Sequence, residues 1–156
     1  GYDSLGKCVR IIDDSEDDYC QMSPLMGSKN ITTIEFQIWP AQKNKPLNFY
    51  VTSAFRIAFH LTFRENGMIS YYDGSIWHDL NTYDVNRWYS IQLTDFTLDT
   101  CDIYVDGVLV VDNAKMRGKR STTLGVMFET YPSCAGGAWY IDSVKIFYVT
   151  SNNDNA

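Results

Sequence analysis

The sequence lacks the motifs that identify the common classes of enzymes and metal-binding domains. It contains no GxSxG, HExxH, P-loop or dinucleotide-binding pattern. Its four cysteines form no CxxC pair, and no Cys/His spacing resembles that of a zinc site. These absences argue against a serine hydrolase, a zinc peptidase, a nucleotide-binding enzyme and a zinc-stabilised fold.

Long apolar runs and basic clusters are also missing. No run approaches the roughly 20 apolar residues that a membrane-spanning helix needs, and the start, GYDSLGKCVR, does not resemble a signal peptide. The formal net charge is −6, and the Lys and Arg residues are scattered. We therefore expect no nucleic acid and no membrane insertion. Because the chain begins with Gly1 rather than Met, we expect a mature product or an excised module. We expect a monomeric module of a larger protein.

The composition fits one globular domain of 156 residues. Apolar residues make up 45% and charged residues 21%, which is enough for a packed core. Aromatic residues make up 15%. Because Tyr and Trp combine a flat apolar face with a polar group, this content favours sheets and surfaces that bind by stacking.

The dominant hydrophobic period is two, which predicts short strands separated by turns such as Asn66-Gly67 and Asp106-Gly107. The strand after Asp73-Gly74 is expected to place Trp77 in the core. About a dozen strands imply an all-β, two-sheet antiparallel β-sandwich at 1–150 and a flexible tail at 151–156. The predicted strands are Lys7–Ile12, Tyr19–Ser23, Ile31–Trp39, Leu47–Thr52, Arg56–Arg64, Met68–Tyr72, Ile76–Leu80, Trp88–Thr94, Cys101–Val105, Val108–Asp112, Thr122–Glu129 and Trp139–Val149.

The four cysteines predict two disulfide bonds and a secreted or cell-surface protein, although three connectivities and free buried thiols remain alternatives. The acidic segment 13–18 is interpreted as a loop that folds Cys8 opposite Cys20. That pairing leaves Cys101 for Cys134.

Alternation within the strands separates apolar side chains from those of the opposite face. If the early strands share one sheet, its outer face combines aromatic rings with hydrogen-bonding and charged groups. Rings stack on the C–H faces of sugars, and paired donors and acceptors bind hydroxyl groups, so we predict a carbohydrate site there. The alternative is the ordinary polar face of an antiparallel sheet. The candidate ligand-binding residues are Trp39, Tyr50, His60, Arg64, Arg56, Gln37, Asn48 and Glu35.

Two other functions compete with non-catalytic polysaccharide binding. A polysaccharide lyase that acts on uronic-acid polymers by β-elimination could use Tyr50 or His60 as its base and Arg64 and Gln37 to neutralise the carboxylate. A glycosidase is disfavoured because no ExDxxE run supplies paired carboxylates. The third function is an adhesion or receptor-type module that binds protein.

Four segments resemble elements of concanavalin A-like (laminin G-like) jelly rolls. They are YYDGSIWHDL, VNRWYSIQL, DIYVDGVLV and AWYIDSVKIF, and they span about Tyr71–Phe147. Similar modules accompany polysaccharide-degrading enzymes. The resemblance implies a sandwich with a concave face, a glycan ligand and, in many members, a structural calcium ion.

A calcium site can be assigned to residues on this basis. The apolar parity of the last strand changes between Ile141 and Val144, which predicts a bulge at Asp142-Ser143. Asp142 matches the position of a calcium ligand in carbohydrate-binding jelly rolls. Asp13 and Asp14 could supply further oxygen ligands, unless the acidic segment is only a solvated turn.

Overall fold

The computed structural model describes residues 8–15, 17–18, 20–23, 25–53, 56–120, 123–131 and 136–149. Within these ranges the chain forms twelve strands and no helix, and so it contains no helix that could cross a membrane. The strands are β1 (Val9–Asp13), β2 (Gln21–Met22), β3 (Leu25–Pro40), β4 (Leu47–Ser53), β5 (Arg56–Phe63), β6 (Met68–Tyr72), β7 (Trp77–Thr82), β8 (Tyr89–Thr94), β9 (Thr100–Val105), β10 (Val108–Lys115), β11 (Thr123–Thr130) and β12 (Gly137–Val149).

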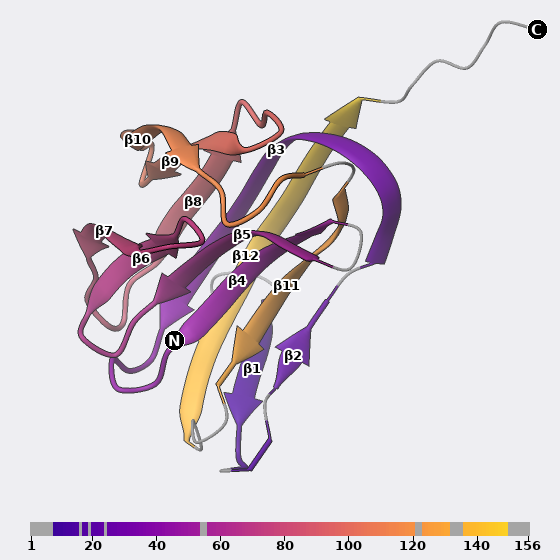
Figure 1. Cartoon of the computed structure of the whole chain (residues 1–156). Helices are drawn as coiled ribbons and strands as arrows, with labels where there is room; N and C mark the ends of the chain where they lie inside the picture. The colour runs from indigo at the N-terminus through magenta and orange to yellow at the C-terminus, as the bar shows by residue number, and fades with distance from the viewer. Residues whose placement is uncertain are drawn as a thin grey trace, which may run out of the picture.

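The strands form two antiparallel sheets that face each other. Sheet A has the order β10-β9-β8-β3-β12-β1. Sheet B has the order β11-β4-β5-β6-β7, with β2 and the start of β3 on the free side of β11. β3 belongs to both sheets and curves from one layer to the other (Figure 1). The predicted β-sandwich is therefore confirmed.

Inward-facing aromatic side chains join the two sheets. Phe36 of sheet A lies with its ring centroid 4.6 Å from that of Phe49 and 5.0 Å from that of Phe128, both in sheet B. All three side chains are at most 2% exposed. Burial of apolar surface of this kind is the main force that holds a sandwich together.

The first predicted hairpin is wrong. β1 pairs with β12 in sheet A, whereas β2 pairs with β11 in sheet B, so the segments that flank the acidic loop diverge into different layers. Cys8 and Cys20 accordingly do not pair with each other, and neither they nor buried Cys101 form a disulfide bond with a cysteine of the described ranges. Cys134 lies outside the described residues, so its pairing with Cys101 stays a prediction.

The predicted bulge in the last strand is confirmed. Asp142 pairs with Gln37 and Lys145 with Glu35. Between these two pairs, β12 therefore contains one residue more than β3. Ser143 takes a left-handed conformation with φ of 53°. Its backbone N–H donates to the Asp142 carboxylate over 2.6 Å.

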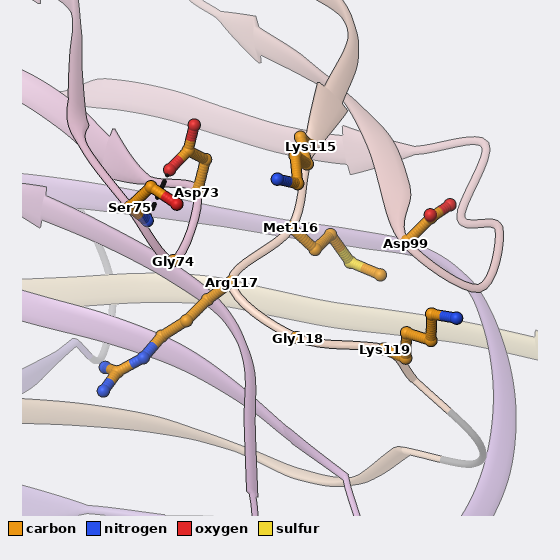
Figure 2. A pocket seen from close by; sticks show the side chains of 9 residues that line it. All are labelled: Asp73, Gly74, Ser75, Asp99, Lys115, Met116, Arg117, Gly118 and Lys119. Carbon is orange, nitrogen blue, oxygen red and sulfur yellow. Dashed lines mark hydrogen bonds between the residues drawn. The ribbon is translucent and has the colours of Figure 1, made fainter.

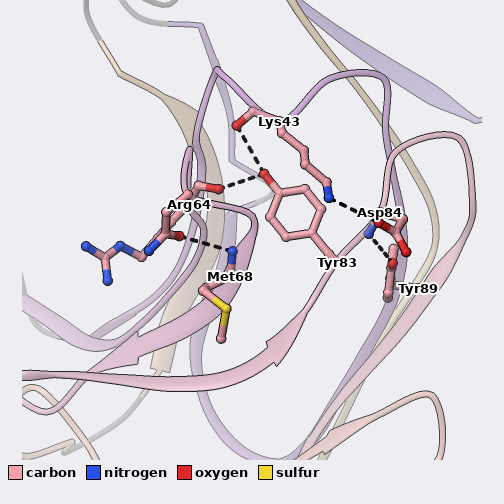
Figure 3. A network of polar contacts seen from close by, with 7 residues as sticks. Lys43, Arg64, Met68, Tyr83, Asp84 and Tyr89 are labelled. Atoms are coloured by element: carbon pink, nitrogen blue, oxygen red, sulfur yellow. Dashed lines mark hydrogen bonds and ion pairs between the residues drawn. The ribbon is translucent and has the colours of Figure 1, made fainter.

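A second aromatic cluster fixes the end of β5. Tyr83 packs against Phe63 and Trp139 at centroid distances of 5.1 and 6.2 Å. Its hydroxyl donates to the backbone carbonyl of Arg64 over 2.8 Å and lies 3.4 Å from the carbonyl of Lys43 (Figure 3). The buried tyrosine therefore holds the backbone from which the Arg64 side chain leaves the sheet.

Tyr83→Phe tests this anchor. The variant removes one of two donors to the Arg64 carbonyl, which still accepts from the Gly67 N–H. We expect the free energy of unfolding to fall by about 1 kcal/mol, the usual net contribution of one hydrogen bond. Chemical denaturation measures the change. Tyr104→Phe is the control, because the Tyr104 hydroxyl has no hydrogen-bond partner among the residues that the structure describes. Equal losses in both variants would contradict the assignment.

Candidate functional site

The structure divides the predicted site residues between two surfaces. Glu35, Gln37 and Trp39 point to the outer face of sheet A, because their part of β3 pairs with β12 and β8. Asn48 and the other candidates on β4 and β5 belong to sheet B. The assumption that these strands share one sheet is therefore wrong, and the two groups face opposite sides of a sandwich roughly 10 Å thick.

The sheet A candidates have partners of their own. The Gln92 amide donates to the Glu35 carboxylate over 2.8 Å. Trp39 packs edge-on against Tyr140, with ring centroids 5.2 Å apart. Because Gln37 lies on this sheet, it cannot act together with Tyr50, His60 and Arg64, and the set proposed for a lyase is not assembled.

On sheet B, strand pairing brings together a group of polar side chains that we call the polar floor. Pairing across β4, β5 and β6 aligns Tyr50 with His60, Asn48 with Thr62, and Thr62 with Ser70. All of them alternate with core residues and so belong to the outer face of the sheet. They are nonetheless buried, with exposures between 0% and 5%. The polar floor consists of Asn48, Tyr50, His60, Thr62 and Ser70.

The polar floor contains two buried atoms without a hydrogen-bond partner. His60 Nε2 and Asn48 Oδ1 lie 2.9 Å apart, but His60 Nδ1 and Asn48 Nδ2 have no hydrogen-bond partner among the residues that the structure describes. By contrast, Thr62 Oγ1 donates to the carbonyl of Leu47 and Ser70 Oγ to the carboxylate of Asp79. A buried polar group left unpaired costs about 1 to 3 kcal/mol, which a hydroxyl group from a ligand would recover.

The His60 side chain is neutral at physiological pH. Burial of the ring, helped by the positive charge of Arg117, lowers the pKa of His60 to about 3. With the Asn48 amide oxygen facing Nε2, this nitrogen carries the hydrogen of the neutral ring and donates it. The floor thus contains a buried acceptor at His60 Nδ1 and buried donors on Asn48 Nδ2 that are unpaired within the described part of the chain.

Aromatic and charged side chains border the polar floor, and we call Tyr72, Trp77 and Arg64 the rim. Trp77 is 37% exposed, and the centroid of its ring lies 4.8 Å from that of the His60 ring and 5.1 Å from that of the Tyr72 ring. The Arg64 guanidinium lies 5.5 Å from the centre of the Trp77 ring and 3.4 Å from the carboxylate of Asp79. The expected core position of Trp77 is therefore wrong.

Sequence reasoning also missed two charged residues of this surface. Glu129 of β11 pairs with Asn48 and hydrogen-bonds to the Tyr50 hydroxyl; burial and this carboxylate raise the pKa of Tyr50. The alternation of residues along β11, which directs Glu129 away from the core, could have identified it. Arg117 lies 5.6 Å from the Tyr72 ring. It belongs to the loop between β10 and β11, where no periodicity indicates its direction.

The residues predicted to bind calcium do not form one site. Asp13 is 3% exposed, and its carboxylate accepts hydrogen bonds from the Thr130 hydroxyl and the Ser15 backbone N–H. Asp13 pairs with Gly137 of β12, five residues before Asp142, which corresponds to about 17 Å. Asp14 is exposed, and no group of three or more metal-ligating side chains occurs in the described ranges. Calcium binding stays a prediction.

The amino-acid sequence matches a family model. The model described as "Sialidase-like, CBM domain", where CBM stands for carbohydrate-binding module, covers residues 3–131. No curated protein matches the sequence.

Solved structures with carbohydrate-related names share the fold. A sialidase superposes with a TM-score of 0.80 at 17% identity, over 95% of this chain and 16% of the sialidase, so this chain spans a small part of that protein. Galectin LEC-6 of Caenorhabditis elegans gives 0.60 at 12% identity, over 89% of this chain and 96% of the galectin. CBM66 from Bacillus subtilis gives 0.52 at 12% identity, over 90% and 91%. The jelly-roll resemblance is confirmed.

The neutral state of His60 predicts a pH-dependent stability. Between pH 6.5 and about 3 the unfolded chain binds a proton at this residue and the folded protein does not. The free energy of unfolding should therefore fall with decreasing pH in this window, by up to about 1.4 kcal/mol per pH unit. Denaturant titrations from pH 6.5 to 5 measure the slope. His60→Gln should reduce the slope, and an unchanged slope in this variant would contradict the prediction.

Proposed function

The chain belongs to the family of sialidase-like carbohydrate-binding modules, and we propose that it binds its glycan over the polar floor and the rim of sheet B. A module of this kind recognises carbohydrate without catalysing a reaction. The observation that carries the choice of surface is the pair of unpartnered buried atoms, His60 Nδ1 and Asn48 Nδ2, beside an exposed tryptophan.

The rim is suited to a sugar ring. Trp77 and Tyr72 present apolar faces against which the C–H groups of a pyranose can pack. Arg64 already contacts Trp77, and its guanidinium keeps donors for hydroxyl groups at the edge of the ring. Stacking of this kind supplies affinity, while the charged edge orients the sugar.

The floor is suited to sugar hydroxyl groups. Sugar hydroxyl groups can donate to His60 Nδ1 and accept from Asn48 Nδ2. Because both atoms are buried, the sugar reaches them only when neighbouring side chains move aside. Both side chains are held by their mutual hydrogen bond and by burial, so little conformational entropy is lost when the sugar binds.

The proposed site lies in a module of a longer protein. The chain covers 16% of the sialidase that it resembles, and carbohydrate-binding modules typically act outside the cell. We therefore place the protein in an extracellular setting, where a monomeric module would keep its parent protein on a polysaccharide. Trp39, Gln37 and Glu35 take no part in this binding.

Two tryptophan variants test the surface. Trp77→Ala should weaken binding to glycans selected on an array at least tenfold, which is about 1.4 kcal/mol, because it removes the exposed ring. Trp39→Ala is the matched control on sheet A and should leave affinity unchanged. Calorimetric titration measures both, after thermal melts verify folding. Loss of binding in Trp39→Ala alone would move the site to sheet A.

The affinity for a neutral glycan should also stay constant between pH 6 and 8. His60 has a pKa of about 3, so it offers the same acceptor throughout this range. Titration calorimetry in matched buffers measures the affinity at each pH. A tenfold change with a midpoint near the ordinary histidine value would show that His60 is protonated at the site or that another group controls binding.

A further inference from the structure

A groove beside the rim is not used by the site described so far. It consists of two adjoining hollows. The larger lies between the loop that follows β10 and the start of β5, and the smaller lies between this loop and the turn between β6 and β7 (Figure 2). Its larger part has a volume of about 560 Å³ and is lined by Arg56, Ile57, Arg117, Gly118 and Lys119. A smaller part of about 260 Å³ shares Arg117, Gly118 and Lys119.

Backbone contacts preform this groove. Gly118 N–H donates to the carbonyl of Ala58 over 3.1 Å, and Met116 N–H to the carbonyl of Asp99 over 2.7 Å. On the other side, a Cβ atom on Gly74 would lie 2.7 Å from the carbonyl oxygen of Arg117, and Gly74 has φ of +96°. The loop is therefore seated directly against β5 and the β6–β7 turn.

The groove carries a local positive charge on a protein whose net charge is −6. Every charged residue that lines the larger part is a cation, and none of them forms an ion pair with a residue of the described ranges. Asp73 and Asp99 line the smaller part, but the Asp73 carboxylate is already bound by His78 and by two backbone N–H groups. We call Arg56, Arg117 and Lys119 the cationic groove.

Arg117 connects the cationic groove to the proposed glycan site. Its guanidinium carbon lies 5.6 Å from the centre of the Tyr72 ring, which belongs to the rim. Arg117 and Lys119 leave the loop in different directions (Figure 2). Cations spread along a groove fit a chain with several negative groups better than they fit a single small anion.

We propose that the cationic groove binds the carboxylate or sulfate groups of an acidic polysaccharide whose neighbouring sugar lies on the rim and polar floor. This inference rests on the proposed function, because the rim supplies the first sugar position. Arginine guanidinium groups form paired hydrogen bonds with carboxylate and sulfate oxygens, and Lys119 adds a mobile charge. The protein then selects for acidic chains despite its own negative charge.

The test removes the groove charges and keeps the rim residues Tyr72, Trp77 and Arg64, of which only Tyr72 loses a contact, the one with Arg117. Arg56→Gln, Arg117→Gln and Lys119→Gln are combined in one variant, and Arg10→Gln, Lys29→Gln and Lys145→Gln, which lie on β1, β3 and β12, form a control with the same net charge. Calorimetry with polygalacturonate and its methyl ester tests carboxylates. Dextran sulfate and dextran test sulfates.

In each pair, the acidic polymer is compared with its uncharged counterpart, and the pair whose acidic member binds the unmodified protein is the responsive pair. The groove variant should bind this acidic polymer at least tenfold more weakly, and its affinity should depend less on salt concentration. The control variant should bind both members of the pair like the unmodified protein. Equal losses in the two variants would indicate unspecific attraction and overturn the inference, as would unchanged binding in the groove variant or the absence of binding to either acidic polymer.

Failure of the inference can be distinguished from failure of the proposed function. If the groove variant keeps its affinity while Trp77→Ala loses array-selected glycans, the rim binds sugar and the cationic groove does not bind acidic groups. If Trp77→Ala keeps its affinity for those glycans, the proposed sheet B site itself is wrong.

Discussion

The packing of the two sheets through their inward aromatic side chains is the constraint on which the rest of the structure depends. Phe36 meets Phe49 and Phe128 across the sandwich, and β3 passes through both layers. Once these side chains are buried, the alternate residues of β4, β5 and β6 must lie on the outside of sheet B. The position of the polar floor thus follows from the core, because successive side chains of a strand point to opposite faces of the sheet.

The polar floor lowers the free energy of unfolding relative to a floor of apolar side chains. Buried atoms of His60 and Asn48 lack partners, and the folded state keeps His60 neutral against its ordinary tendency to accept a proton near pH 6.5. Unpaired buried groups in a native fold are few, and they are expected mainly at functional or strained sites or where a water or ion completes them. Stability and the proposed recognition of sugar therefore depend on the same side chains, and a tightly held histidine would give the proposed site an acceptor that does not vary with pH.

The proposed binding surface combines a sheet with a loop. Strand pairing positions the rim and floor, whereas the cationic groove exists because the chain crosses from β10 in sheet A to β11 in sheet B beside the β6–β7 turn. Gly74 permits the close approach that this crossing requires. The same fold can thus keep its platform and change its charge preference through one loop, which is a common way for sandwiches to vary their ligands.

Local alternation in the sequence was sufficient to predict the all-β fold, the bulge at Asp142 and the outward direction of Asn48, Tyr50 and His60, because the period of two depends only on neighbouring residues. Tertiary structure decided which strands share a sheet. It moved Trp39 to the opposite face and separated Cys8 from Cys20, because strand pairing depends on contacts distant in sequence. It also brought Arg117 to the rim, because a loop without periodicity takes its direction from the elements against which it packs.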